Sequence, residues 1–169
     1  MPTIEIVSLG RENLIKLNRK KYPFQIQQER KLVSHRNLFN NYLANKKGVI
    51  FHLGNLGLSR KGFWFASDLV DWDFESESII VSGEDEEVSE GSPYFRFRLE
   101  YLNGVKDLMF KAFNQSPLQT VLFLTDYQFG SCPASNVSLD EIKKLWKIHD
   151  SEGLKWNTLY NISSISCSR

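Results

Sequence analysis

Apolar residues either alternate with polar ones or form short runs, and both patterns predict strands. Residues 3–9 (TIEIVSL) alternate, and Gly10 ends the segment. Residues 49–53 (VIFHL) and 119–125 (QTVLFLT) are almost wholly apolar, as strands are when a sheet buries both of their faces. Short apolar and aromatic runs separated by Gly, Ser and charged residues continue from 48 to 81, which predicts that this stretch forms the middle of the sheet.

Apolar residues three and four positions apart predict helices before and after these strands. Residues 25–47 carry the longest such stripe and end on two lysines and a glycine, a common way for a helix to end. Residues 11–21 predict a shorter helix, which Pro23 prevents from continuing. A third stripe covers 105–113, and Pro117 bars its continuation.

The C-terminal part contains a helix start with a specific signature. Ser138 and Glu141 have the spacing of a capping box, so we expect a helix that runs to about His149. Residues 127–137 before it are expected to form a loop. A last strand is predicted at 155–162, followed by a flexible tail at 163–169.

Together these elements predict a single α+β domain spanning residues 1–162. Strands and helices interleave without a regular β-α repeat, which favours a largely antiparallel, or else mixed, sheet flanked by two or three helices. A chain of 169 residues is long enough to bury a core without a metal or disulfides. Its 12 Phe, 6 Tyr and 4 Trp predict that this core is rich in aromatic rings.

Cysteine content and hydropathy favour a soluble, cytoplasmic protein. Cys132 and Cys167 do not have the spacing of a metal site and do not suggest a disulfide framework. The N-terminal residues lack the pattern of a signal peptide, and no apolar run approaches the length of a membrane span. We therefore expect no membrane contact, and no motif predicts a cofactor.

The net charge of +1 hides a strong asymmetry along the chain. Residues 1–48 hold ten basic side chains and three acidic ones, whereas 49–100 hold four basic and eleven acidic. Such a layout steers a charged partner or lets the two parts complement each other within one fold, and we favour the second. Residues 82–92 are acidic and bounded by glycines, which predicts a surface loop with the charge to meet a basic partner.

Four acidic residues after Val70 would share one face of an extended strand and repel each other. A divalent cation or a neighbouring positive strand would relieve that repulsion. The four are Asp71, Asp73, Glu75 and Glu77.

Residues 94–101 (YFRFRLEY) offer the positive strand. An antiparallel pairing would set Arg96 and Arg98 beside the aspartates and would turn the other face of the strand to the core. That face carries Phe95, Phe97, Leu99 and Tyr101. We favour this ion pairing over a metal site. The competing interpretation is one helix from Ser92 through Phe113, against which Asn103-Gly104 counts.

Three weaker patterns bear on catalysis and on nucleic acids. A metal-dependent hydrolase would use an imidazole with clustered carboxylates, namely His52, Asp68, Asp71 and Asp73. A nucleophilic site would combine Cys132 with Asp126 and a histidine, although a free cysteine is more often inert. The basic residues of 16–36, with Tyr22 beside Arg19-Lys20-Lys21, would suit a nucleic-acid backbone, although the end of a solvated helix explains them as well.

The sequence therefore predicts a small binding or regulatory protein, not an enzyme. We expect a protein partner, basic if the acidic residues mediate the contact, and we rank nucleic-acid binding and metal-dependent hydrolysis below this function. The residues predicted to contact the partner are Trp64, Asp71, Asp73, Glu75, Arg96 and Arg98.

Overall fold

The computed structural model describes residues 3–29, 47–54, 66–71, 94–126, 132–146 and 153–164. Its main layer is a six-stranded sheet in the order β2-β3-β1-β6-β9-β7. All neighbours in this sheet are antiparallel except β7 and β9, which are parallel. The strands are β1 (Thr3–Leu9), β2 (Ile26–Glu29), β3 (Gly48–Leu53), β6 (Thr120–Asp126), β7 (Ala134–Ser138) and β9 (Thr158–Ser163).

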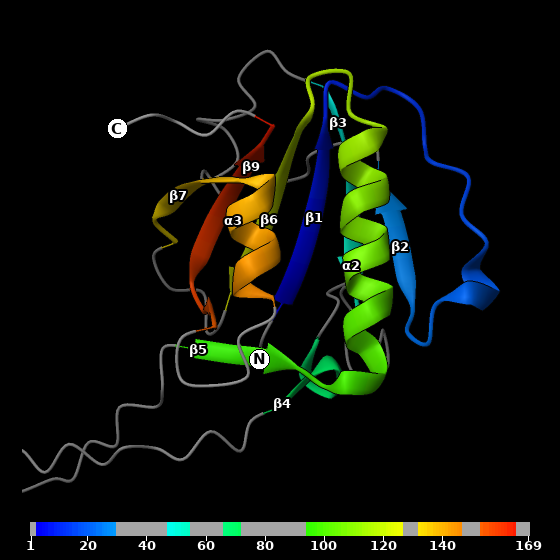
Figure 1. The fold of residues 1–169 in the computed structure, drawn as a ribbon. Coiled ribbons are helices and arrows are strands. Elements are labelled where there is room, and N and C mark those ends of the chain that lie inside the picture. The colour runs from blue at the N-terminus through cyan, green and yellow to red at the C-terminus, as the bar shows by residue number, and fades with distance from the viewer. Residues whose placement is uncertain are drawn as a thin grey trace, which may run out of the picture.

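A second, three-stranded sheet has the order β4-β5-β8. Figure 1 shows α2 and α3 on one face of the main sheet and the small strands β4 and β5 across one end of it. This arrangement confirms the predicted α+β class and its largely antiparallel sheet. The remaining elements are β4 (Val70–Asp71), β5 (Tyr94–Phe97), β8 (Leu154–Lys155), the helices α2 (Leu99–Asn114) and α3 (Leu139–Leu145), and the 3₁₀ turns η1 (Arg19–Lys21) and η2 (Ser67–Leu69).

The two central strands, β1 and β6, are buried on both faces. Ile6 and Phe123 face the helices and join one apolar cluster, whereas Val7 and Leu122 face the other way and join a second cluster. The strand predicted at 3–9 is confirmed, as is the doubly buried strand predicted near 119–125.

The prediction that the sheet is centred on 48–81 is wrong. β3 forms as a buried strand, but it lies second from the sheet edge, between β1 and the short edge strand β2. A run of apolar residues indicates that a strand is buried. An inner strand beside a short edge strand is as fully buried as a central strand, so the run does not identify the centre of the sheet. Residues 55–65 and 72–81 lie outside the described part of the chain.

The helix predicted at 11–21 is also wrong, because these residues form an irregular segment that ends in η1. The side chain of Gln28 takes the place of helical hydrogen bonds here. Its Oε1 accepts from the Ile15 N–H at 2.9 Å, and its Nε2 donates to the Ile15 carbonyl at 2.8 Å. An amide side chain that satisfies both backbone groups of one residue favours a non-helical path.

The start of the helix predicted at 25–47 is wrong, because its first residues form the edge strand β2. Ile26 pairs with Leu53, and Glu29 pairs with Ile50, so residues 26–29 are β2. The predicted helix began at residue 25 although its apolar stripe lies further along the chain, and backbone pairing with β3 decides residues 26–29. Residues 30–46 lie outside the described part.

The two interpretations of 94–113 are each half right. The predicted strand forms but ends at Phe97, and the helix begins at Leu99, well after Ser92. Leu99, expected on the core face, is 73% exposed because the chain turns into the helix at that residue. The stripe predicted at 105–113 is confirmed as the buried face of α2.

The capping box is confirmed at the start of α3. Ser138 Oγ accepts from the Glu141 N–H, and Glu141 Oε2 accepts from the Ser138 N–H at 2.7 Å. The helix ends at Leu145, earlier than the sequence suggests, with Trp146 as its C-cap. His149 lies outside the described part.

The last strands differ from their prediction. Residues 134–138, expected in a loop, form β7 beside β9. The single strand expected at 155–162 is two strands, since Asn157 adopts a φ of 52° between β8 and β9. Ser163, placed in the expected tail, belongs to β9, and residues 165–169 lie outside the described part.

Candidate functional site: a cleft between β5, α2 and α3

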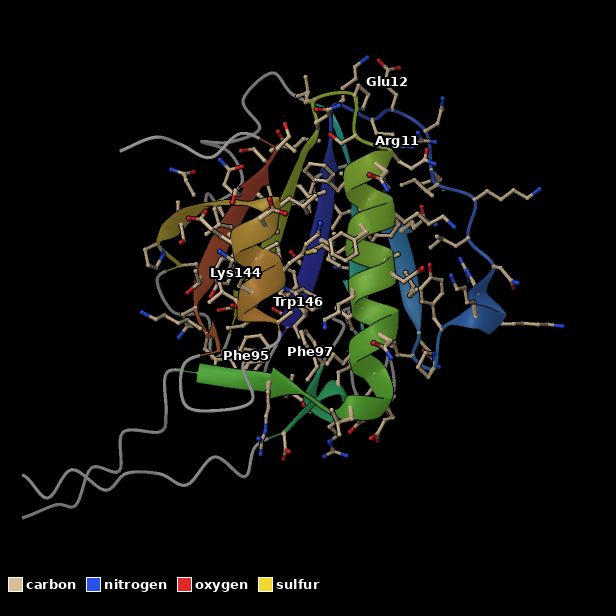
Figure 2. All side chains as sticks on the ribbon, viewed as in Figure 1. Arg11, Glu12, Phe95, Phe97, Lys144 and Trp146 are labelled. Atoms are coloured by element: carbon tan, nitrogen blue, oxygen red, sulfur yellow. The ribbon has the colours of Figure 1, made fainter. Side chains whose placement is uncertain are left out.

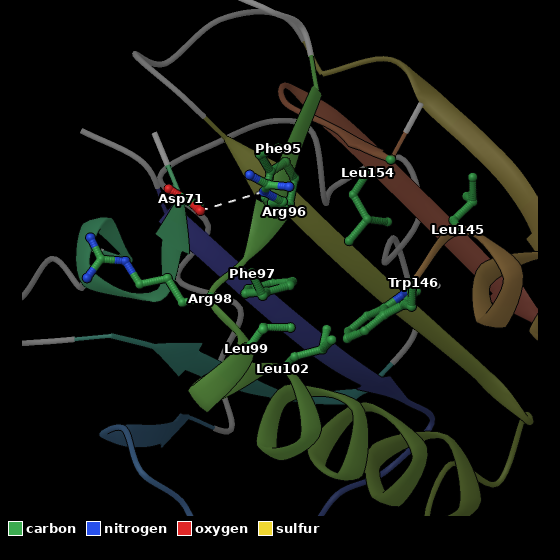
Figure 3. Close-up of a pocket in the computed structure, with 11 residues that line it drawn as sticks. Asp71, Phe95, Arg96, Phe97, Arg98, Leu99, Leu102, Leu145, Trp146 and Leu154 are labelled. Atoms are coloured by element: carbon green, nitrogen blue, oxygen red, sulfur yellow. Dashed lines mark ion pairs between the residues drawn. The ribbon is translucent and has the colours of Figure 1, made fainter. Parts of the chain in front are cut away.

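A cleft of about 240 Å³ opens where β5, the start of α2, the end of α3 and β8 meet. Its floor is aromatic: Phe97 stacks on Trp146 with ring centroids 5.6 Å apart and contacts Phe95 edge to face at 5.4 Å. Figure 3 shows the polar residues Asp71, Arg96 and Arg98 on one side of the cleft and Trp146 with two leucines on the other. Aromatic walls with a few polar groups are typical of binding sites.

An ion pair stands at one side of the cleft. Arg96 Nε lies 3.6 Å from Asp71 Oδ2, and the two residues are directly opposite in the β4–β5 register. This pairing confirms the predicted neutralisation of Asp71 by an arginine of the same fold. Arg98 was predicted to pair with an aspartate as well, but its Nε donates to the Val70 carbonyl at 3.2 Å. The other residues predicted to contact a partner, Trp64, Asp73 and Glu75, lie outside the described residues.

Trp146 contributes a hydrogen-bond donor to the cleft wall. Its side chain is 5% exposed, and its Nε1 has no acceptor among the described residues. Leaving a buried N–H unpaired costs free energy, and in native structures such a group usually has a functional explanation. The sequence predicts only that Trp146 lies on the helix that follows Ser138, because the spacing of residues does not reveal an unpaired donor.

The start of α2 adds further donors at the cleft. Arg98 is the N-cap residue, and its side chain makes no capping hydrogen bond. The amides of Tyr101 and Leu102 bond to the Arg98 carbonyl, which leaves the Leu99 and Glu100 amides without an acceptor in the described part. Of these two residues, Leu99 lines the cleft, whereas Glu100 lines a separate hollow beside Lys21 and Tyr22. Unpaired amides and the helix dipole make a helix start favourable for an anion.

Comparison with known proteins does not indicate a function for this cleft. The chain matches no family model, no curated protein and no solved structure. Within the described residues, neither helix has the length and apolar character needed to cross a bilayer.

His52 is held by two carboxylates of the main sheet and lies apart from the acidic residues after Ala66. Its Nδ1 lies 3.1 Å from Glu5 Oε1 on β1, and its Nε2 lies 3.4 Å from Glu29 Oε2 on β2. The contact with Glu29 is electrostatic, because Nε2 makes no hydrogen bond within the described part of the chain. Asp68 belongs to η2, and Asp71 pairs with an arginine, so the structure does not join them to His52. No grouping of three His, Cys, Asp or Glu side chains in the described ranges could hold a metal ion. Asp73 lies outside these ranges.

Glu5 and Glu29 change the titration of His52. Burial by itself lowers the pKa of His52, but the hydrogen bond and negative charge of Glu5, with a smaller effect of Glu29, outweigh burial and raise the pKa above its ordinary value. The protonated imidazole is therefore favoured in the folded protein.

We expect His52 to stabilise the fold more at low pH than at high pH. A histidine whose pKa is raised by folding stabilises the protein fully at pH values below its unfolded pKa, about 6.5. This stabilisation is lost as the pH rises through the folded pKa. The His52→Gln substitution should thus lower the free energy of unfolding by about 1 kcal/mol more at pH 6 than at pH 9. Urea unfolding of both proteins at the two pH values measures the difference, and an equal cost at both would contradict it.

Cys132 and Asp126 do come together, as the nucleophile hypothesis requires. The Cys132 thiol lies 3.8 Å from Asp126 Oδ1, at the end of β6. Both side chains are buried, at 3% and 1% exposure, so a substrate has no direct access to the sulfur. His52, the one histidine in the described part, points its nitrogens at Glu5 and Glu29. The thiol is thus a buried core group here.

A thiol reagent should distinguish a buried Cys132 from a reactive one. In a Cys167→Ser background, we expect Cys132 to react with a disulfide reagent roughly a hundredfold more slowly in native protein than in urea, because only opened molecules expose it. Native and unfolded rates that agree within about fivefold would mean that the sulfur is accessible.

The basic segment before β2 is tied to α2. Lys21 Nζ and the Tyr22 hydroxyl both donate to the Asp107 carboxylate at 2.8 Å. Burial and Asp107 raise the pKa of Tyr22, while the Lys21 hydrogen bond lowers the pKa of Asp107. Tyr22 is buried and packs on Phe24 at 5.9 Å, so its ring offers no open face to a base.

Proposed function

We propose that this protein works by binding a segment of a partner protein in the cleft between β5, α2 and α3. The observation that carries the proposal is the combination of an aromatic floor with two arginines, in a hollow of about 240 Å³. Leu99, on its rim, is the most exposed large apolar side chain of the described residues at 73%. Exposed apolar residues beside a hollow are typical of protein contact sites.

The chemistry of the cleft supports binding over catalysis. Its basic groups are Arg96 and Arg98, and a guanidinium keeps its proton at neutral pH, so it holds an anion but does not transfer protons. The remaining charged side chain, Asp71, is paired with Arg96. These groups suit recognition of a carboxylate.

The cleft favours an acidic group on the partner. The expectation of a basic partner rested on the acidic residues of 71–92. The structure describes only Asp71 among them, and Asp71 is paired with Arg96. In the described cleft, two arginines face one aspartate, and the start of α2 adds its partial positive charge. We therefore propose a partner segment that combines an apolar side chain with a carboxylate.

Selection from a library of displayed random peptides tests the proposal. Peptides enriched on the wild-type protein should lose binding to the Leu99→Glu variant, since the new charge stands at the cleft rim and repels a carboxylate. Leu99 is mostly exposed, so the variant should keep its fold. The Leu118→Glu variant, at an exposed leucine in the turn between α2 and β6, is the matched control and should retain binding.

Two results would reject the proposal. In one, no peptide is enriched over a bare support. In the other, enriched peptides bind the Leu99→Glu and Leu118→Glu variants equally well. Melting curves of both variants, expected to match wild type within a few degrees, show that loss of binding is not loss of fold.

A further inference from the structure

Trp146 brings an unpaired hydrogen-bond donor to an apolar part of the cleft. The residue is 5% exposed, and its Nε1 has no acceptor within the described part of the chain. Its ring stacks on Phe97, with centroids 5.6 Å apart, and lies 5.7 Å from Phe123. Figure 3 shows Leu145 and Leu154 on the same side of the cleft. An acceptor for this N–H therefore has to enter surroundings made of rings and leucines.

We infer that the cleft binds an extended segment of the partner, one backbone carbonyl of which accepts a hydrogen bond from Trp146 Nε1. The inference rests on the proposed function and adds to it the acceptor that is recognised and the conformation of the bound segment. The contact joins one donor to one acceptor, so it requires nothing of Arg96 or Arg98. Extended segments in aromatic-lined grooves are a recurring mode of peptide recognition.

The surroundings of Trp146 select a neutral acceptor over a charged one. Burying a carboxylate without a counter-charge costs far more free energy than burying a peptide carbonyl that gains a hydrogen bond. Phe97, Phe123 and the two leucines offer no positive charge, and the arginines stand on the other side of the cleft. The carboxylate of the partner is therefore a separate group, and the group that reaches Trp146 is a carbonyl.

A carbonyl that is free to accept also restricts the shape of the segment. Inside a helix, each carbonyl already accepts from the amide four residues further on, whereas an extended segment leaves its carbonyls available. The Phe97 and Trp146 rings are 5.6 Å apart, which is less than the length of two extended residues at roughly 3.3 Å each. An apolar side chain on Phe97 thus brings its own carbonyl, or that of a neighbouring residue, within reach of Trp146.

The test measures binding of the most strongly enriched displayed peptide, prepared with an ester in place of each amide in turn. An ester keeps the shape of the chain but is a weaker acceptor at its carbonyl. In full-length wild-type protein, one ester position should weaken binding roughly three- to tenfold, the value of one hydrogen bond. The unmodified peptide should shift the Trp146 indole N–H resonance downfield in ¹⁵N-labelled protein, because that proton gains an acceptor.

Two variants assign the affected carbonyl to Trp146. Each ester also removes one amide N–H of the peptide, so a loss at one position alone does not identify the donor. In Trp146→Phe, which keeps a ring on Phe97, the loss at that position should fall below about twofold. The Trp146→benzothienylalanine variant, with sulfur in place of the indole N–H, should behave in the same way. It keeps the size of the ring, so it answers the case in which Trp146→Phe loosens the core.

Trp156→Phe is the matched control, because Trp156 stacks on Phe95 at 4.0 Å but lies outside the residues that line the cleft. It should leave the loss at the same ester position unchanged. Arg11→Gln is the remote control and should change no affinity, since Figure 2 shows Arg11 at the opposite end of the main sheet from Phe95, Phe97 and Trp146. Melting curves of all variants show which of them keep the fold.

Three results overturn the inference and leave the proposed function standing. In the first, peptide binding depends on Leu99, but no ester position weakens it. In the second, the same ester position matters equally in wild type and in both Trp146 variants, which assigns the carbonyl to another donor. In the third, the bound peptide is helical in its NMR contacts. If no displayed peptide is enriched at all, the proposed function fails and the inference fails with it.

Discussion

Replacing Phe123 by alanine should lower the free energy of unfolding by about 3–5 kcal/mol, the largest loss we expect from one apolar substitution in this chain. Phe123 is fully buried on β6, and its ring lies 5.7 Å from Trp146, 6.0 Å from Tyr160 and 6.4 Å from Phe97. These three rings come from α3, β9 and β5, so no single movement closes the cavity left by the truncation. The cost of a cavity is highest where its walls cannot collapse.

Urea unfolding followed by circular dichroism measures this loss. The slope of free energy against urea should stay unchanged, so that the whole effect appears in the midpoint. Leu118→Ala, at a half-exposed position, should cost less than about 0.5 kcal/mol and serves as the control. A loss below about 1 kcal/mol for Phe123→Ala would mean that these rings do not form a packed core.

Replacing Gly104 by leucine should cost about 1–3 kcal/mol, because the added side chain has no room against the segment before β2. A Cβ built at Gly104 would lie 2.9 Å from Phe24 Cε1 and 3.2 Å from Pro23 Cδ. Glycine in a helix interior costs about 1 kcal/mol relative to alanine, so its presence inside α2 reflects this close approach.

A double-mutant cycle separates crowding from helix propensity. In a Phe24→Ala background, the Gly104→Leu change should become neutral or stabilising, since the ring is gone and leucine favours the helix. Asn103→Leu, on the exposed side of the same helix, should stay within about 0.5 kcal/mol in both backgrounds. An equal cost of Gly104→Leu in the two backgrounds would show that Phe24 does not limit the space.

Elements with local signals were predictable from the sequence. The strand at 3–9 alternates and ends at Gly10, which has a φ of 78°, and both features act within a few residues. The start of α3 depends on Ser138 and Glu141, which satisfy each other's backbone amides. Such signals do not require knowledge of the rest of the fold.

Elements that depend on distant partners were not predictable. The segment 11–21 has helical spacing, yet Gln28 of the edge strand satisfies the backbone of Ile15. β7 has a sequence (ASNVS) with little strand preference and exists through its parallel pairing with β9. The glycine inside α2 was not predictable either, because its position there is explained by the close approach of Phe24.

The candidate site was predictable only in its charged part. Alternation in 94–97 and in the acidic stretch was enough to anticipate the pair between Arg96 and Asp71. Trp146 was not anticipated as a binding residue, because an indole N–H without an acceptor is a property of the packed chain. Leu99 was placed in the core, since its exposure arises from the switch from strand to helix at that residue.

The most direct measurement is an NMR perturbation map of ¹⁵N-labelled protein with the most strongly enriched displayed peptide. The largest shifts should fall on the cleft, at residues 96–102, 145–146 and 153–154, and on the Trp146 indole N–H. Shifts confined to other surfaces, such as β7 at the end of the described sheet or the basic turn η1, with these residues unchanged, would contradict the assignment of function to the cleft.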